Sequence, residues 1–225
     1  MRAIRGVLFD MGDTLLGRGD GAAILRAEAR KLGSDVDAVT ARRIWREIQD
    51  RARTAEEIAK GRDLSERAHR ECWTALYGAA DVVAPGLGAV LYEREISADA
   101  WQPFPDTRPV VAALRTAGIP MVIVSDTGWD IRPVLKRHDL LGFFTGLVLS
   151  YEHGVAKPAP QLFEKACELL GVEPDDALMV GDNALTDGGA IESGIRVYLL
   201  PQARHQGPRG LDAVLRLVGV GLTSP

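Results

Sequence analysis

The chain is poor in the residues and segments that mark several classes of protein. Its two cysteines, Cys72 and Cys167, lie far apart and outside any C-x-x-C spacing. This argues against a disulfide framework or a zinc cluster and favours a reducing compartment. No apolar stretch approaches the roughly 20 residues that cross a bilayer, and residues 1–13 reach an acidic cluster too soon for a signal peptide. We therefore expect a cytoplasmic protein with no membrane partner.

The sequence also lacks a strong excess of charge of either sign. Lys and Arg number 27 against 31 Asp and Glu, so the formal net charge is −4. A grip on nucleic acid along a whole surface needs an excess of positive charge, so we expect no nucleic-acid partner. The chain has 225 residues, 46% of them hydrophobic, and this is enough to bury a sizeable core.

Five short apolar runs predict the strands of a parallel sheet. These runs are residues 3–9, 121–125, 146–150, 177–181 and 196–200. Segments of helical character alternate with the last four, near 107–117, 130–138, 159–170 and 184–193. Strands that alternate with helices are typical of βαβ units. Strands that are apolar almost throughout indicate a sheet covered on both faces, so the sequence predicts an α/β fold.

The stretch between the first two predicted strands has a different pattern. From about Gly21 to Ile96, apolar residues recur at helical spacing among Arg and Glu, as at Ile44 and Ile48. Glycines punctuate the stretch and divide it into four predicted helices with little or no strand. The first strand therefore belongs with the later α/β unit, and a helical insertion of roughly 80 residues separates it from its partners.

Polar and acidic residues follow the predicted strands at the points where the strands end. In chain order these are Asp10, Gly12, Asp13, Ser125, Asp126, Lys157, Asp182 and Asp187. Ligands of an open α/β sheet bind beyond the carboxyl ends of its strands, so we expect these residues to converge at one edge.

The types of residue in this group indicate a chemistry. Carboxylates clustered without histidine or cysteine are hard oxygen ligands, which suit Mg²⁺ bound together with a substrate phosphate. Lysine is a compact point charge for phosphate oxygens, and a serine hydroxyl can donate to them. An aspartate can itself attack phosphorus and form an aspartyl-phosphate, which splits one hard step into two.

Four segments of the chain, taken in order, resemble the motifs of the haloacid dehalogenase-like (HAD) hydrolase superfamily, in its phosphatase branch. They are VLFDMGDTL (7–15), VIVSD (122–126), AKP (156–158) and LMVGDNALTD (178–187). The resemblance spans nearly the whole chain. It implies a Rossmann-like α/β core with a parallel five-stranded sheet, and an inserted all-helical cap of the C1 type. We assign residues 1–16 and 101–225 to the catalytic core and residues 17–100 to the cap.

The resemblance implies a magnesium site. Asp10 would be both the nucleophile and a metal ligand. The backbone carbonyl of Gly12 would be a second protein ligand and Asp182 a third. Asp187 would support the metal site by holding these ligands in position.

It also implies the contacts of a small phosphorylated substrate. Ser125 and the backbone amide of Asp126 would bind the phosphate. Lys157 would neutralise charge on the nucleophile and on the phosphoryl group. Trp129, directly after the second motif, either lines the substrate pocket or belongs to the core. Neither the identity of the substrate nor the oligomeric state follows from the sequence, and a homodimer stays open.

One position departs from the family pattern. Most phosphatases of the family carry a second aspartate two residues after the nucleophile, which acts as general acid and base. Here that position is Gly12, where we expect a positive φ that a substitution would strain, and the carboxylate lies one place further on, at Asp13. Asp13 or a water then transfers the proton, or the substrate has a good leaving group that needs none.

This departure leaves two other functions open beside the phosphatase. One is the chemistry of the dehalogenase and phosphonate-cleaving branches, which also lack the second aspartate. The other is a non-catalytic phosphate-binding protein. The dehalogenase branch needs no magnesium and lacks the Gly-Asp pair of the fourth motif. That pair is kept here as Gly181 and Asp182, which favours metal-dependent hydrolysis of a phosphate ester.

Overall fold

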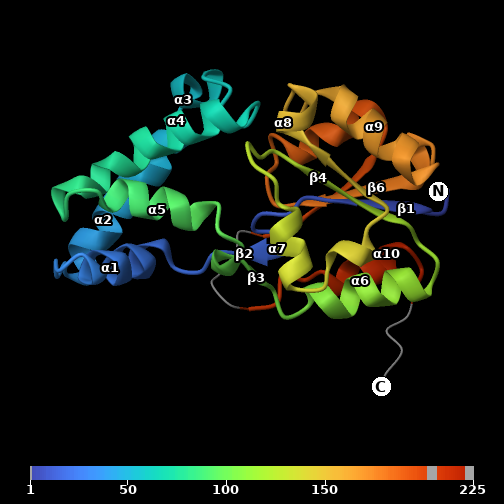
Figure 1. Cartoon of the computed structure of the whole chain (residues 1–225). Coiled ribbons are helices and arrows are strands. Elements are labelled where there is room, and N and C mark those ends of the chain that lie inside the picture. The colour runs from blue at the N-terminus through green and yellow to red at the C-terminus, as the bar shows by residue number, and fades with distance from the viewer. Residues whose placement is uncertain (1, 202–206, 221–225) are drawn as a thin grey trace.

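The computed structural model describes residues 2–201 and 207–220. Figure 1 shows an α/β part on the right and a group of helices on the left. The remaining residues of the predicted core, 1, 202–206 and 221–225, lie outside the described part of the chain.

Five strands of the described chain form one parallel sheet. They are β1 (Gly6–Phe9), β4 (Met121–Ser125), β5 (Gly146–Leu149), β6 (Ala177–Gly181) and β7 (Arg196–Leu199). Their order is β5-β4-β1-β6-β7, and every pairing is parallel. The predicted five-stranded α/β fold is confirmed. Because β1 is the central strand, the segment that follows it lies between the ends of β4 and β6.

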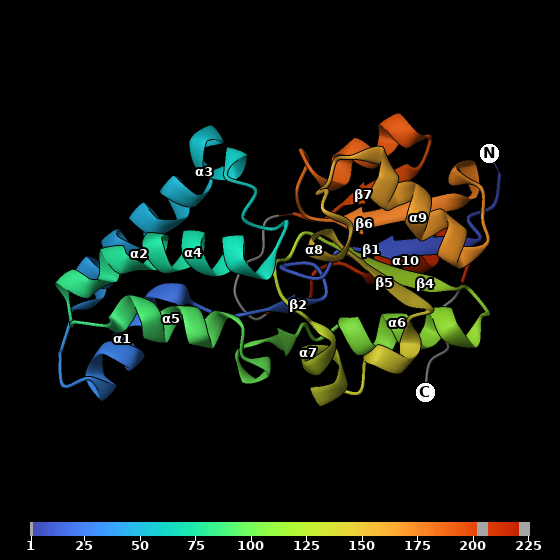
Figure 2. The same cartoon turned by 45° about the horizontal axis from the view of Figure 1, so that its top comes forward.

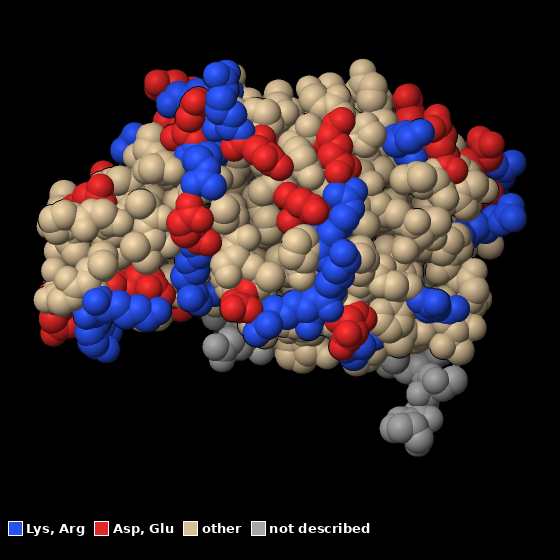
Figure 3. All heavy atoms as spheres, in the orientation of Figure 1, with Lys and Arg blue, Asp and Glu red and all other residues tan. Residues whose placement is uncertain are grey.

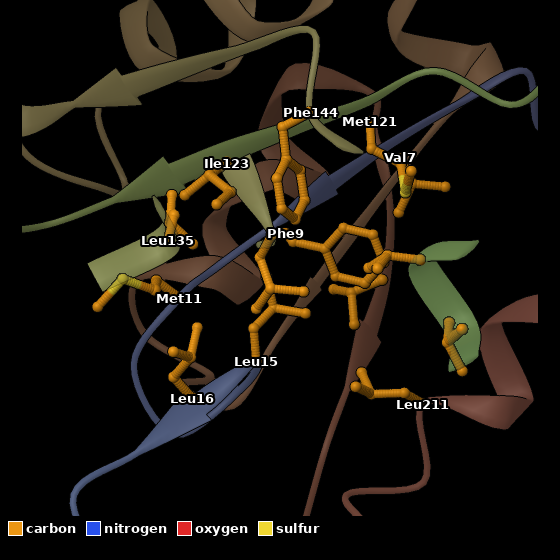
Figure 4. Close-up of a cluster of buried hydrophobic side chains, with 14 of the residues drawn as sticks. Val7, Phe9, Met11, Leu15, Leu16, Met121, Ile123, Leu135, Phe144 and Leu211 are labelled. Carbon is orange, nitrogen blue, oxygen red and sulfur yellow. The ribbon is translucent and has the colours of Figure 1, made fainter. Parts of the chain in front are cut away.

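Alternate residues of β1 face two hydrophobic clusters, one on each side of the sheet. Val7 and Phe9 belong to the larger cluster, which Figure 4 shows, whereas Leu8 belongs to the other. The larger cluster includes residues of α6 (Thr107–Thr116), α7 (Arg132–Arg137) and α10 (Asp212–Leu217). Both faces of the sheet are therefore covered, as expected.

Helix α9 (Pro160–Leu170) covers the opposite face with η5 (Asp187–Ser193), a 3₁₀ helix. We expected a segment of helical character near 184–193, and the structure has a helix of the 3₁₀ type over the last seven of these residues. Two adjacent glycines weaken an α-helix there, and a Cβ at Gly189 would overlap Pro158. The shorter elements of this part are α8 (Ser150–His153), η2 (Ala98–Ala100), η3 (Leu141–Phe143) and η4 (Pro174–Asp176).

Residues 21–95 form the second part, which we call the helical part. Its elements are α1 (Gly21–Lys31), α2 (Ala38–Ala52), α3 (Ala55–Ala59), α4 (Glu66–Tyr77), η1 (Gly78–Val82) and α5 (Leu87–Glu95). It has a hydrophobic cluster of its own, which includes Leu25, Ile44 and Leu76. The four expected helices correspond to α1, α2, α4 and α5. The short α3, which Thr54 caps at the amide of Glu57, was not expected.

Two linkers join the helical part to the α/β part, and they lie side by side. The first comprises residues 10–20 and the second residues 96–106. Strand β2 (Leu16–Gly17) pairs antiparallel with β3 (Gln102–Pro103), which Figure 2 shows between the two parts. Beside them, Arg18 of the first linker forms an ion pair with Glu95 at the end of α5. Two-residue strands carry no periodic pattern, so the sequence did not predict this pairing.

Charges of both signs are interspersed over the face in Figure 3. This agrees with the small net charge of −4. Among the described residues, no helix combines the length and the apolar character that crossing a membrane requires.

Candidate active site

Three aspartates meet at the carboxyl edge of the sheet. Asp10 directly follows β1, and its amide donates to the carbonyl of Val180 in β6, at 2.9 Å. Asp182 directly follows β6, and Asp187 begins η5. One carboxylate oxygen from each aspartate lies within 4.8 Å of the others. The edge of the sheet that the sequence indicated therefore carries a compact group of oxygen ligands.

Lys157 lies between two of these carboxylates. Its Nζ donates to Oδ1 of Asp10 at 2.8 Å and to Oδ1 of Asp187 at 2.5 Å. The lysine is 6% exposed, so both ion pairs are buried. Its backbone amide donates to Oδ1 of Asp126 at 2.8 Å, which fixes the lysine loop against the segment after β4.

Asp187 organises the loop that carries Asp182. Its Oδ2 accepts the backbone amides of Asp182 and Asn183, both at 3.0 Å. A side chain at Gly181 would overlap Asp187, so glycine is needed for this close approach. Both oxygens of Asp187 are thus engaged, and the residue positions Lys157 and Asp182 around the site.

Burial and crowding of negative charge shift the pKa values of this group. Burial raises the pKa of Asp10 to about 8, against the opposing charge of Lys157 and with a further contribution from Asp187. Burial and the charges of Asp13 and Asp187 raise the pKa of Asp182 to about 6. Burial opposes the charge of Lys157, but Asp10 and Asp187 hold its pKa above the usual value. The lysine alone therefore does not offset the negative charge of the site.

The donor set fits a hard divalent cation such as Mg²⁺. It consists of carboxylate oxygens, with no histidine or cysteine among the described residues of the group. The raised pKa values of Asp10 and Asp182 indicate carboxylates whose ionised forms a nearby cation would stabilise. Gly12, whose carbonyl we predicted as a ligand, lies partly buried in the turn that follows Asp10.

The turn after Asp10 has an unexpected conformation. Asp13 has φ of 53°, whereas Gly12 is not among the glycines with positive φ. The expectation of a positive φ at Gly12 is wrong, because the turn reverses one residue later, at an aspartate, a residue that tolerates left-handed backbone. A Cβ at Gly12 would meet the ring of Trp101 at 3.7 Å, an ordinary contact.

Ser125 and Trp129 occupy different settings near the second motif. Ser125 ends β4 next to the central strand and is 4% exposed. Trp129 packs against the larger hydrophobic cluster, with its ring centroid 6.3 Å from that of Trp101. The contacts of both residues with a substrate stay predictions.

Two residues that hold the site in place were missed in the sequence. Arg209 is buried, and its Nε donates to the carbonyl of Asp13 at 2.6 Å. Ser150 accepts the amide of Thr127 at 2.8 Å and donates to the carbonyl of Asp63 at 2.6 Å. Ser150 thereby joins the loop before α4 to the segment after β4. Neither residue lies in a motif, so no pattern marked them.

A cleft of about 710 Å³ opens beside this site. Asp13 and Asp182 line it from the α/β part. The two linkers and helices α1, α2, α4 and α5 form its other walls. Of the three aspartates of the acidic group, Asp182 lines this cleft, so a small molecule that enters between the two parts reaches the edge of the group.

Comparisons with known proteins agree with this geometry. The family model of haloacid dehalogenase-like hydrolases matches residues 4–194. A relative called glyceraldehyde 3-phosphate phosphatase, from Methanopyrus kandleri, is 29% identical over 94% of this chain and 91% of its own length.

Two solved structures have the same fold. The HAD phosphatase from Thermococcus onnurineus has a TM-score of 0.64 and is 25% identical, over 96% of this chain and 98% of that one. A 2-haloacid dehalogenase from Pseudomonas syringae has a TM-score of 0.60 over the same shares of the two chains, at 19% identity, which shows the fold alone. The ordered motifs, their convergence at the sheet edge and the family match over residues 4–194 lead to one conclusion: the chain belongs to the haloacid dehalogenase-like hydrolase family.

Proposed function

We propose that this protein is a magnesium-dependent phosphatase that hydrolyses a small phosphorylated metabolite through an aspartyl-phosphate on Asp10. The observation that carries the proposal is the position of the Asp10 carboxylate. Its Oδ1 is held by Lys157 at 2.8 Å, and an oxygen of Asp182 lies within 4.8 Å. A carboxylate fixed in this way has one oxygen oriented by the lysine and the other available to attack.

The two steps of the proposed reaction use this chain's own residues. A carboxylate oxygen of Asp10 attacks phosphorus, the bond to the leaving oxygen breaks, and that oxygen takes up a proton. Water then attacks the aspartyl-phosphate, loses a proton, and releases inorganic phosphate and the Asp10 carboxylate. Ser125 and the amide of Asp126 would bind the phosphate oxygens, and Lys157 would stabilise the transferred charge.

Magnesium would be held by Asp10, Asp182 and the carbonyl of Gly12, and would offset the repulsion between an anionic nucleophile and an anionic substrate. Support for this comes from the pKa of Asp10, which burial raises to about 8 without a metal. A nucleophilic carboxylate must be ionised, and at neutral pH the cation would favour that form. Asp187, whose oxygens are both engaged, would keep Asp182 and Lys157 in position.

Two observations favour a phosphatase over the other branches of the family. The relative from Methanopyrus kandleri carries a phosphatase name and matches nearly the whole chain. The Gly181–Asp182 pair and the Asp187 contacts of the fourth motif, which suit a metal site, are present. The helical part, proposed as a cap over residues 17–100, would close over the cleft, exclude water and select small substrates.

A phosphate-release assay tests the proposal. Purified protein is assayed with p-nitrophenyl phosphate and a panel of phosphorylated metabolites, in Mg²⁺, in EDTA, and in EDTA followed by Mg²⁺. We expect turnover in Mg²⁺, loss in EDTA and recovery on return of the metal. Turnover that ignores EDTA, or release of chloride from 2-chloropropionate, would assign the chain to the dehalogenase chemistry. No turnover of any ester would favour the non-catalytic alternative.

A further inference from the structure

The cleft beside the active site has two walls of opposite character. The wall on the α/β part carries the carboxylates of Asp13 and Asp182. The wall on the helical part, which we call the helical wall, includes Trp45 and Gln49 of α2, Arg53 directly after the end of α2, and Arg94 of α5. The acidic wall belongs to the proposed metal site, but the proposed chemistry does not account for the composition of the helical wall.

Three residues of the helical wall, Trp45, Gln49 and Arg53, form a stripe along α2 and its C-terminal end. Trp45 and Gln49 are four residues apart and lie on one face of the helix, and Arg53, four residues further on, caps its C-terminal end with helical backbone and continues that face. The adjacent face carries Ile44 and Ile48, which pack in the hydrophobic cluster of the helical part. Trp45 also packs against this cluster, whereas Gln49 and Arg53 do not belong to it, so packing does not explain the two polar members of the stripe.

The helical wall contains polar groups that lack partners. Nε2 of Gln49 and Nε of Arg94 are buried atoms without a hydrogen-bond acceptor among the described residues. Arg53 is exposed and lines the cleft, and it forms no ion pair with a carboxylate of the described chain. Nη1 of Arg94 lies 3.6 Å from Oε1 of Glu28, an oxygen that Lys31 also contacts at 2.9 Å. A buried donor without an acceptor destabilises the folded state, and an acceptor on a ligand would offset that cost.

The other charged residues around the cleft already have partners. Glu95 is bound by Arg18 and by the hydroxyl of Tyr77, the latter at 2.9 Å. Asp99 pairs with Arg137 at 2.7 Å. The positive charge that remains uncompensated on the helical wall is therefore that of Arg53 and, in part, that of Arg94.

The wall also offers an aromatic surface and considerable space. The ring of Trp45 lies directly against Gly21, where a Cβ would overlap it, and it stacks on Tyr77 with centroids 6.0 Å apart. Phe104 lines the cleft from the second linker. The volume of about 710 Å³ falls in the usual range for small-molecule sites of roughly 300–1,000 Å³.

We propose that the helical wall binds a second anionic group, a carboxylate or a phosphate, on the leaving group of the substrate. Arg53 and Arg94 supply the charge, Gln49 supplies a further donor, and Trp45 covers the body of the molecule between its two anionic ends. The substrates are then phosphate esters with an anion at each end. This inference rests on the proposed phosphatase function, since it takes the cleft as the place of the leaving group.

Matched pairs of esters that differ in one charge test the inference. The first pair is 6-phosphogluconate and sorbitol 6-phosphate, in which a carboxylate replaces a hydroxymethyl group. The second pair is fructose 1,6-bisphosphate and fructose 6-phosphate, which tests a phosphate instead. For each pair, the ratio of kcat/KM values of the doubly anionic and the singly anionic ester is measured. We expect at least one ratio to exceed 10, and the pair that shows it identifies the second anion.

Variants of the helical wall connect that ratio to the structure. Arg53→Gln and Arg94→Gln should each lower the ratio about tenfold, through KM rather than kcat. The matched control is Arg46→Gln, which removes a positive charge from an exposed residue of the same helix outside the cleft. Ratios near 1 for both pairs in the unmodified protein, or equal effects of Arg46→Gln and Arg53→Gln, would contradict the inference.

A binding measurement separates this inference from the proposed function. Calorimetry with 6-phosphogluconate and with fructose 1,6-bisphosphate is carried out on the Asp10→Asn variant, with and without Arg53→Gln. Binding that weakens about tenfold in the double variant supports the helical wall even if no ester is turned over. If p-nitrophenyl phosphate is hydrolysed with Mg²⁺ but binding does not depend on Arg53, the phosphatase stands and the second anion site is wrong.

Discussion

Lys157 and Asp10, 147 positions apart in the chain, form a buried ion pair with Nζ and Oδ1 separated by 2.8 Å. The same Nζ contacts Asp187, so one lysine serves two buried carboxylates. Removal of one partner of a buried ion pair leaves an uncompensated charge, which costs more than the pair itself contributes. The lysine is thus important for stability as well as for the proposed chemistry.

Lys157→Met should destabilise the fold by about 3–5 kcal/mol at neutral pH, because it leaves Asp10 and Asp187 unpaired. Urea unfolding followed by circular dichroism gives the change in the free energy of unfolding. The control is Lys165→Met on α9, an exposed lysine that pairs with Glu168 and should cost less than about 1 kcal/mol. Equal effects of the two substitutions would show that the buried pairs contribute little.

Asp10→Asn should remove turnover while the fold is kept. We expect p-nitrophenyl phosphate hydrolysis to fall by at least about 10³-fold, because an amide cannot form the phosphoryl ester. Burial raises the pKa of Asp10 from 3.8 to about 8, so without divalent metal this group makes the folded state less stable as the pH rises from about 4 to 8. Asparagine should remove that pH dependence, and Lys157 keeps Asp187 as its partner in the variant. Activity within tenfold of the unmodified protein would overturn the role of Asp10 as nucleophile.

The sheet could be predicted closely from the sequence. Runs of apolar residues bounded by polar ones predicted 121–125 and 177–181, and these are the observed β4 and β6. A strand covered on both faces must be apolar throughout, so its pattern is strong. The β2–β3 pairing and the short α3 depend on local capping and on contacts between linkers. Such contacts leave no periodic signal in the sequence.

The candidate site could be predicted only in part. The convergence of Asp10, Lys157 and Asp182 follows from the rule that strand ends meet at one edge. The hydrogen bond of Asp126 to the amide of Lys157, and that of Arg209 to the carbonyl of Asp13, depend on loop conformations. Residue type and spacing do not determine such conformations, so these contacts required the structure.

His69 should make the protein less stable as the pH falls. It lies buried in α4, where Nδ1 is 3.2 Å from the hydroxyl of Tyr92, and a Cβ at Gly128 would overlap it. Burial lowers the pKa of His69 to about 4, from 6.5 in the unfolded chain. The unfolded state therefore binds more protons between these values. The contribution of His69 is full above pH 6.5 and is lost as the pH falls to about 4.

Urea unfolding at pH 7 and pH 4.5 measures this effect in the unmodified protein and in His69→Gln. Between these values the unmodified protein should lose on the order of 2 kcal/mol more than the variant. Burial raises the pKa of Asp63, 3.9 Å from His69, to about 6, with the opposite effect on stability, so the difference between the two proteins is the relevant quantity. His153→Gln, at an exposed histidine, is the control. Parallel pH profiles for the unmodified protein and His69→Gln would show that His69 is not the group responsible.

The last prediction concerns the proton that the leaving group needs. Asp13 is exposed, lines the cleft and is fixed in a left-handed turn by Arg209, so its carboxylate is placed beside the site. If Asp13 supplies the proton, Asp13→Asn should slow alkyl phosphates by about 10²-fold or more. It should change p-nitrophenyl phosphate much less, because nitrophenolate leaves without a proton. The measurement is the ratio of kcat/KM for the two classes of substrate, and an unchanged ratio would assign the proton to a water or to the substrate.

Gly12→Asp is the complementary change, and the structure makes it a cleaner experiment than the sequence implied. Gly12 lacks a positive φ, and a Cβ there meets only the Trp101 ring, at 3.7 Å, so the substitution should not strain the turn. If acid catalysis limits the unmodified protein, the added aspartate should raise the rate for alkyl esters but not for p-nitrophenyl phosphate. Gly12→Asn, which has the same shape without the acid, separates proton transfer from packing against Trp101. Equal rates of Gly12→Asp and Gly12→Asn on alkyl esters would show that the missing aspartate at position 12 does not limit proton transfer.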